Sequence, residues 1–349
     1  MEDIHVILEE LCSHSSENDV LATIVHVEGS AYRKEGASML FQEDGTQVGM
    51  LSAGCLEEDL AVRIQEHGLG KRAETVVYDM RGYNELSWGE MSGCNGVIHV
   101  FVEPVDQQRR KHLGQLKYYL DHRRSVTMIK SLTPQENQQS LFFFIEGNEV
   151  LGTKEEEVPT ELKNLSEQAA MLYEKPGKRR LCMIDEDVFI QQFRPKPRLF
   201  VFGAGKDARP LVSFAARSGF SVIVADWRPA LCNRTNFPDA DQLIQGFPEE
   251  IFAEINITPN DHVVILTHNF QKDKELLSYL KEKPLQYLGV LGSSRRTKRL
   301  LGTRELPSHI TSPIGLSIDA EGPEEIAISV VAELITFKKS QNVKRAVGS

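Results

Sequence analysis

The stretch "RLFVFGAGKDARPLVSFAARSGFSVIVADW", Arg198 to Trp227, decides the fold of the C-terminal half of the chain. It begins as an apolar strand, turns at a glycine loop, and continues into a helix with Pro210 in its first turn. Gly203, Gly205 and Ala208 satisfy the pattern G-x-G-x-x-A directly after the strand. The two glycines permit a tight turn and a close approach of a pyrophosphate, and the small third residue lets the helix pack on the sheet. The stretch therefore predicts the first unit of a dinucleotide-binding fold.

The second strand of this stretch ends in a carboxylate. Asp226 follows Gly203 by 23 residues, close to the roughly 20 residues at which a carboxylate binds a ribose hydroxyl in such folds. Further along, "DHVVILTHN" and "YLGVLGSS" repeat the short apolar strand, with an amphipathic helix between them. Apolar strands that alternate with helices are typical of a parallel sheet covered on both faces. We therefore expect an α/β fold with a Rossmann-like, doubly wound parallel sheet in domain 196–349.

Polar residues follow the predicted strands at the edge where such sheets bind ligands. Lys206, after the second glycine, either neutralises a phosphate or points into solvent. His268 ends the strand "VVILTHN" and has either a site role or a capping role. The run "SSRRTKR" is either a solvated helix face or a contact for a ligand phosphate. The edge therefore offers a candidate site, for a nucleotide or NAD(P), that consists of Gly203, Gly205, Lys206, Asp226, His268, Ser293 and Arg295.

The first 195 residues follow a different pattern. In domain 1–104, strands alternate with glycine turns, and a helix is predicted from Leu56 to about His67, which indicates an N-terminal α+β domain. Cys55 lies next to the predicted helix start, where unpaired backbone donors favour an anion and ease ionisation of a thiol. Glu57, in the first turn, opposes both effects. Residues 105–195 predict a helix and two strands, and we expect a middle connecting subdomain there.

Composition excludes several classes of function. The 349 residues carry a formal net charge of −10, and binding to nucleic acid or to an anionic membrane depends on clustered Lys and Arg. No apolar run approaches the ~18 residues that span a bilayer, and the acidic start lacks the basic residues of a secretory signal. The five cysteines contain no close pair, so we expect reduced thiols and no metal cage made by the protein. The sequence predicts a cytoplasmic protein.

Motifs in both halves resemble those of a known family. They are "GSAYRKEGASML", "GMLSAGCLEEDL" and "SGCNGVIHVFVEP" near the N-terminus, and "THNFQKDKELL", "YLGVLGSSRRTKRL" and "SPIGLSIDAEGPEEIAISVVAELI" near the C-terminus. In this order they resemble the XdhC/CoxI family of xanthine dehydrogenase accessory proteins. The resemblance covers about residues 29–103 and 198–337, and no motif covers the middle.

The resemblance implies a role in the maturation of molybdenum hydroxylases. Such proteins bind the molybdenum cofactor (molybdopterin), protect it while a cysteine desulfurase supports its sulfuration, and deliver it to a xanthine dehydrogenase-type apo-enzyme. Cys55 and Cys94 would then face the cofactor, because a soft thiolate suits molybdenum or its sulfur. Backbone donors around Gly54 and Gly93 would suit a phosphate or pterin, and Arg33 would supply positive charge.

Three functions remain open from the sequence. The first is a non-catalytic accessory protein that binds the cofactor, for which we expect a homodimer. The second is an NAD(P)-dependent oxidoreductase that uses the same fold, with His268 as proton donor. The third is a redox or nucleotide sensor that changes partners when a cysteine is oxidised. The fold alone does not separate them, because Rossmann domains serve many functions.

Overall fold

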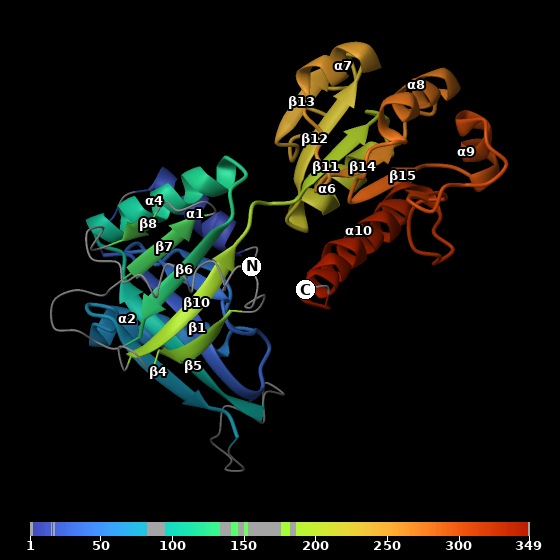
Figure 1. The fold of residues 1–349 in the computed structure, drawn as a ribbon. Helices are drawn as coiled ribbons and strands as arrows, with labels where there is room; N and C mark the ends of the chain where they lie inside the picture. The colour runs from blue at the N-terminus through green and yellow to red at the C-terminus, as the bar shows by residue number, and fades with distance from the viewer. Residues whose placement is uncertain are drawn as a thin grey trace. The chain divides into compact units, whose positions relative to one another are not determined.

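The structure is a computed structural model that describes residues 3–14, 16, 18–81, 95–132, 141–145, 150–152, 176–181 and 186–347. The chain divides into two compact units, Met1–Pro195 and Lys196–Ser349 (Figure 1).

The first unit begins with an antiparallel sheet in the order β3-β2-β1-β5-β4. Helix α2, Cys55–His67, packs on one face, where Leu56 and Leu60 join the core. Helix α1, Asp3–Ser13, packs on the other face through Ile7 and Leu8. The strands are β1 Val20–Ser30, β2 Ser38–Phe41, β3 Gln47–Gly49, β4 Glu74–Asp79 and β5 Asn95–Pro104.

A second antiparallel sheet, in the order β8-β7-β6-β10-β9, completes this unit. Helix α4, Gln107–Asp121, contributes Leu113 and Leu116 to a core that also contains residues of α1, β1, β6 and β10. The middle of the chain therefore shares one hydrophobic core with the N-terminal sheet. The strands are β6 Val126–Ser131, β7 Leu141–Ile145, β8 Val150–Gly152, β9 Gly177–Leu181 and β10 Glu186–Phe193.

A buried ionic cluster joins the two sheets of this unit. The carboxylate of Glu103, at the end of β5, contacts both Arg109 of α4 and Lys130 of β6. All three side chains are buried. Burial lowers the pKa of Arg109 to about 10 and places the pKa of Lys130 well below its ordinary value.

The second unit contains a six-stranded parallel sheet in the order β13-β12-β11-β14-β15-β16. The order reverses between β11 and β14, as in doubly wound dinucleotide-binding sheets. The strands are β11 Arg198–Phe202, β12 Ser221–Asp226, β13 Gln242–Gln245, β14 His262–Ile265, β15 Tyr287–Val290 and β16 Ile310–Thr311. The four central strands β12, β11, β14 and β15 are buried along most of their length, which explains their apolar sequences.

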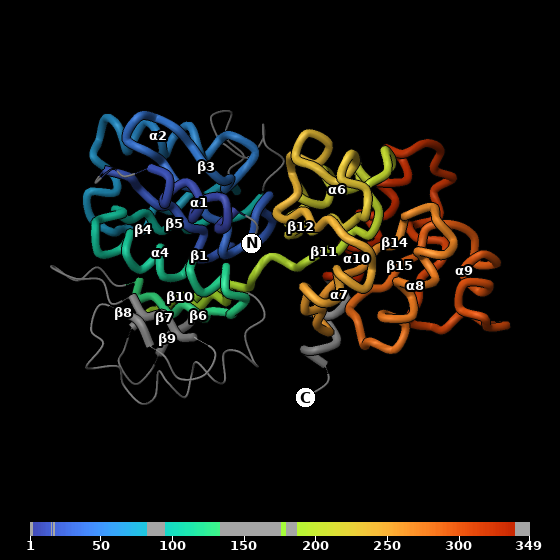
Figure 2. Tube along the Cα trace, turned by 90° about the horizontal axis from the view of Figure 1, so that it is seen from above, coloured from blue at the N-terminus to red at the C-terminus, as the bar shows by residue number. Residues whose placement is uncertain are grey.

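Helices cover both faces of this sheet (Figure 2). On one face, α6 (Ala208–Arg217) and α10 (Gly322–Val347) form a core with residues of β11, β12 and β14. On the other face, α7 (Pro248–Glu254), α8 (Phe270–Leu280) and α9 (Ser294–Leu301) form a second core. The expected α/β class, with an N-terminal α+β part and a C-terminal Rossmann-like parallel sheet, is confirmed.

Local predictions were mostly right where periodicity was strong. The helix expected from Leu56 begins one residue earlier, and the helix that contains Pro210 forms as α6. Helix α1 was not predicted, although Ile4, Ile7, Leu8 and Leu11 have helical spacing. In the described part of the chain, no helix is long and apolar enough to cross a membrane.

Candidate functional site

The glycine loop between β11 and α6 has the backbone that its sequence predicts. Gly203 has φ 122°, a conformation that residues with a side chain rarely adopt. A Cβ atom at this position would also lie 2.5 Å from the carbonyl oxygen of Leu266, at the end of β14. Ala208 is fully buried at the start of α6. The glycine and the alanine therefore let the loop and helix approach the neighbouring strand.

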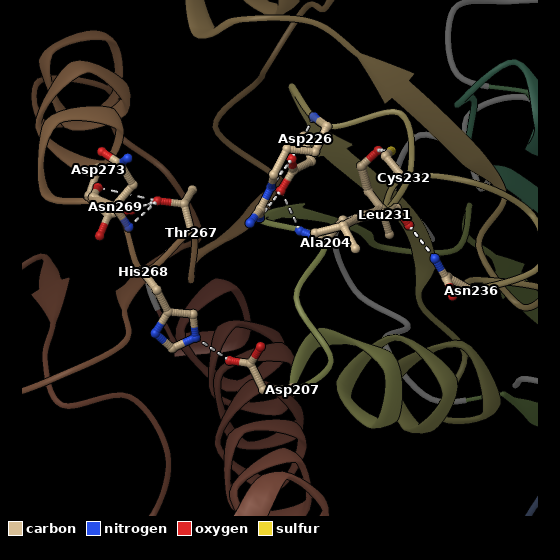
Figure 3. Close-up of polar contacts among 12 residues, drawn as sticks. Ala204, Asp207, Asp226, Leu231, Cys232, Asn236, Thr267, His268, Asn269 and Asp273 are labelled. Carbon is tan, nitrogen blue, oxygen red and sulfur yellow. Dashed lines mark hydrogen bonds and ion pairs between the residues drawn. The ribbon is translucent and has the colours of Figure 1, made fainter.

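Asp226, at the end of β12, is already hydrogen bonded within the protein (Figure 3). Its Oδ2 accepts a bond of 2.7 Å from the amide of Ala204, and its Oδ1 accepts bonds of 2.8 Å and 2.9 Å from the backbone N and Nε of Arg228. Asp226 is only 1% exposed. The carboxylate expected to bind a ribose therefore fixes the glycine loop and pairs with Arg228.

The loop leaves backbone donors free beside a pocket. The amides of Gly205, Lys206 and Asp207 have no hydrogen-bond acceptor among the residues that the structure describes. Lys206 and Asp207 line a pocket of about 380 Å³ at the carboxyl edge of the sheet. Most of its lining is aliphatic and includes Leu211, Leu266, Leu291, Ile314, Ile326 and Val330. The pocket therefore combines an apolar wall with free amides, one exposed lysine and the Asp207 carboxylate, which is paired with His268. The amides and the lysine suit an anion attached to a less polar body.

His268 is the other predicted residue that lines this pocket. It follows β14, and its Nε2 lies 2.6 Å from Asp207 Oδ2 (Figure 3). Ser293 and Arg295 do not belong to the pocket lining. Ser293 caps α9 by accepting a bond of 3.3 Å from the amide of Arg296, and Arg295 is exposed. The structure thus places Lys206 and His268 at one pocket and gives Ser293 a capping role.

In the first unit, Cys55 is the first residue of α2, as predicted. Its thiol is partly exposed. The preceding turn is filled by the side chain of Glu57, which accepts bonds of 2.9 Å, 2.6 Å and 3.2 Å from the amides of Leu51, Ser52 and Gly54. Burial raises the pKa of Glu57, but hydrogen bonds from Ser52 and the backbone outweigh it and leave the pKa below its ordinary value.

Two of the residues expected to bind the cofactor have partners within the protein. Gly54 does not offer a free donor, because its amide bonds to Glu57 and to Ser52 Oγ, each at 3.2 Å. Arg33 forms an ion pair with Asp3 of α1, so its charge is already partly compensated. Cys94 and Gly93 lie outside the described residues. Within those residues, no group of three or more His, Cys, Asp or Glu side chains is placed to hold a metal ion.

The strand order, glycine loop and edge pocket define the second unit as a Rossmann-type binding domain. Residues 199–334 match the XdhC Rossmann domain, residues 12–79 match the XdhC and CoxI family, and residues 107–194 match the BH1974-like central domain.

Whole-length relatives agree with these matches. The chain is 44% identical over 341 residues to a probable xanthine dehydrogenase subunit of Bacillus subtilis, covering 97% of this chain and 98% of that protein. It is 27% identical over 335 residues to the molybdenum cofactor insertion chaperone PaoD of Escherichia coli, covering 94% and 86%. A crystal structure of a xanthine dehydrogenase (BH1974) from Bacillus halodurans is 46% identical, covers 98% of this chain and 97% of that chain, and has a TM-score of 0.82. The chain belongs to the XdhC and CoxI family.

Proposed function

We propose that this chain is a molybdenum cofactor insertion chaperone that serves a xanthine dehydrogenase-type molybdenum hydroxylase. Its membership of the XdhC and CoxI family and its similarity to PaoD support this proposal. The structural observation that carries it is the pocket of about 380 Å³, where an apolar wall meets free amides and Lys206.

The residues present fit both ends of the molybdenum cofactor. The free amides of Gly205, Lys206 and Asp207 and the ammonium group of Lys206 would hold its phosphate. The aliphatic wall would exclude water from the part of the bound cofactor that lies against it, which slows hydrolysis of labile ligands. When bound, the cofactor supplies the metal centre that the recipient enzyme needs, while this chain holds and shields it.

The proposal also includes sulfuration of the bound cofactor and its delivery to the recipient enzyme. The chain would hold the cofactor while a cysteine desulfurase supports its sulfuration, and would then deliver it to the apo-enzyme. Cys55 and Cys94 are proposed to contact the cofactor during these steps. Partial exposure of the Cys55 thiol at the start of α2 supports this role, because a soft sulfur ligand suits molybdenum. A homodimer is proposed for the working state.

Cofactor analysis of protein made in cells that synthesise molybdopterin tests the proposal. Pterin is measured as its fluorescent oxidised derivative, and molybdenum is measured by mass spectrometry. We expect both in the purified wild-type chain and a severalfold loss in Lys206→Glu. Arg209→Glu is the matched control, since Arg209 is exposed in the first turn of α6, three residues after Lys206, and is not part of the pocket lining. A wild-type chain without pterin would refute the proposal.

An NAD(P)-dependent oxidoreductase is the second candidate. The strand order of dinucleotide-binding folds favours it, and His268 lies at the pocket, where a proton donor would be needed. Against it, the Asp226 carboxylate is already bound by Arg228 and Ala204. Binding of NAD(H) or NADP(H) at millimolar concentration, together with an absorbance change on addition of hydroxyl or carbonyl substrates, would favour this candidate over the first.

A further inference from the structure

Asp207 and His268 form a side-chain pair at the pocket, of which the sequence indicated only the histidine. His268 Nε2 lies 2.6 Å from Asp207 Oδ2 (Figure 3). The His268 side chain is 61% exposed, so packing alone does not fix its position. Asp207 therefore holds an accessible imidazole in one orientation at the pocket.

The backbone at His268 is strained, and hydrogen bonds involving α8 and α9 hold the turn that contains it. His268 has φ 58°, in the left-handed region, which is uncommon for residues other than glycine. Thr267 Oγ1 accepts a bond of 3.1 Å from the amide of Asn269 and donates to the buried carboxylate of Asp273. Arg296 binds the same carboxylate at 2.6 Å. Two helices therefore hold the turn in the conformation that presents His268.

The glycine loop is shaped around the other member of the pair. A Cβ atom at Gly205 would collide with Asp207 Oδ1. Any residue with a side chain at position 205 would therefore push the carboxylate away from its place beside His268. Gly205 thus serves the side-chain pair as well as the approach of a phosphate.

The contact with Asp207 fixes the tautomer of the ring. A ring nitrogen at hydrogen-bond distance from a carboxylate carries the proton, so Nε2 is protonated and Nδ1 of the neutral ring is an acceptor. Among the described residues, no group is hydrogen bonded to Nδ1 of His268. This nitrogen is therefore available to a ligand in the pocket.

We propose that His268 exchanges a proton, through Nδ1, with an N–H or O–H group of the ligand in the pocket, and that Asp207 is its positioning residue. In the forward step the ligand's N–H or O–H bond breaks, a bond from that proton to Nδ1 forms, and the Asp207 carboxylate balances the imidazolium charge. The reverse step returns the proton to the ligand. A pterin ring carries such N–H groups, so this inference rests on the proposed function.

The reactivity of His268 tests the pair on the full chain. Diethyl pyrocarbonate acylates unprotonated imidazole nitrogens, and peptide mass spectrometry measures the rate at each histidine. In the cofactor-free chain we expect acylation of His268 to be severalfold faster in Asp207→Asn than in wild type, because the ring is no longer held with Nε2 bonded to a carboxylate and both ring nitrogens can react. His309, which is exposed and bonds to the carbonyl of Lys281 at 2.7 Å, is the internal control and keeps its rate.

Cofactor-loaded protein tests the contact with the ligand. We expect the bound cofactor to protect His268, but not His309, from acylation. His268→Asn is the second variant, because asparagine tolerates a positive φ. It is expected to keep the wild-type melting temperature, which separates loss of the imidazole from loss of the fold.

Each outcome decides one part of the inference. Equal His268 rates in wild type and Asp207→Asn would overturn the positioning role. Equal His268 acylation rates in cofactor-loaded and cofactor-free protein would overturn the proton exchange with the ligand. The chaperone proposal would stand in that case, because the loaded protein contains pterin. Absence of pterin from the wild-type chain would refute both the proposed function and the proton exchange. The His268 acylation rates in the cofactor-free chain would still decide the role of Asp207.

Discussion

Replacing His262 with leucine is expected to remove part of the acid sensitivity of the C-terminal unit. His262 begins β14 and is 2% exposed, and its ring packs edge-on to Phe220 at a centroid distance of 5.3 Å. Neither ring nitrogen has a hydrogen-bond partner among the described residues. Burial lowers the pKa of His262 to about 4. The backbone of Arg198 and the negative charge of Asp261 favour the protonated ring, but their effects are smaller than that of burial.

The pKa difference sets the magnitude and sign of the effect. In the unfolded chain the imidazole titrates near its ordinary pKa of about 6.5, so between pH 6.5 and 4 the unfolded state binds a proton that the native state does not. The stabilising contribution is therefore complete above about pH 6.5 and is lost as the pH falls toward 4. Between pH 7.5 and pH 5.0 the calculated loss is about 2 kcal/mol.

Urea unfolding at the two pH values measures this loss. The chain has two tryptophans, Trp88 and Trp227, so fluorescence in a Trp88→Phe background reports on the C-terminal unit. We expect the free energy of unfolding of His262→Leu to fall by about 2 kcal/mol less than that of the parent between pH 7.5 and 5.0. The control His309→Gln removes an exposed histidine of the same unit and keeps the parent's pH dependence.

A pH dependence shared by His262→Leu and the parent would refute the reasoning. It would mean that the His262 ring is protonated in the native state at pH 5, and hence that burial does not control its titration. A loss of stability in His262→Leu that is the same at both pH values would instead report only a packing defect.

Three further outcomes follow from buried or partly buried polar groups. Glu103→Gln is expected to lower the free energy of unfolding of the first unit by about 3 kcal/mol, because Arg109 and Lys130 would lose their shared carboxylate; calorimetry of the full chain measures it. Asp226→Ala is expected to destabilise the second unit by about 2 kcal/mol through unpaired donors on Ala204 and Arg228, whereas Asp226→Asn, which keeps one acceptor, loses less; urea unfolding followed by Trp227 fluorescence compares them. Cys55→Ala is expected to retain less pterin at an unchanged melting temperature, and wild-type pterin content in this variant would contradict the assignment of Cys55 to the cofactor.

The parallel sheet could be predicted because short, local sequence features specify its strands, turns and helices. Short apolar strands, a glycine loop and a proline in the first helical turn each specify their own conformation, and the alternation of strand and helix specifies the sheet. Strands β9 and β10 were not predicted, because polar residues such as Lys178, Arg180, Gln191 and Gln192 interrupt their apolar pattern. Strand β10 pairs with β6, a segment far from it in the chain, and β9 pairs with β10.

The sequence placed Asp226 and His268 at the ends of their strands but did not show their contacts. The spacing placed Asp226 correctly at the end of a strand, but it could not show that Arg228, two residues later, would bind the carboxylate. The pair of Asp207 and His268 spans 61 residues and forms only because β11 and β14 are neighbours in the sheet. A carboxylate next to the glycine loop was visible in the sequence, but its partner depends on strand order.

The turn before α2 shows a similar limit. The sequence correctly placed Cys55 at a helix start and treated Glu57 as a repulsive charge in the first turn. In the structure this carboxylate folds back onto the amides of Leu51 and Ser52. Side-chain direction, rather than residue type, decided whether these donors remained free.

Asp226 accepts hydrogen bonds from the Ala204 amide and from Arg228, and these bonds affect how the glycine loop would respond when a ligand binds or leaves. Because these internal hydrogen bonds already order this side of the loop, ligand binding does not have to order it, and ligand release does not disorder it. Little conformational entropy is then exchanged in either direction. A loop held in place by internal hydrogen bonds suits the proposed transfer of a bound cofactor to a recipient enzyme.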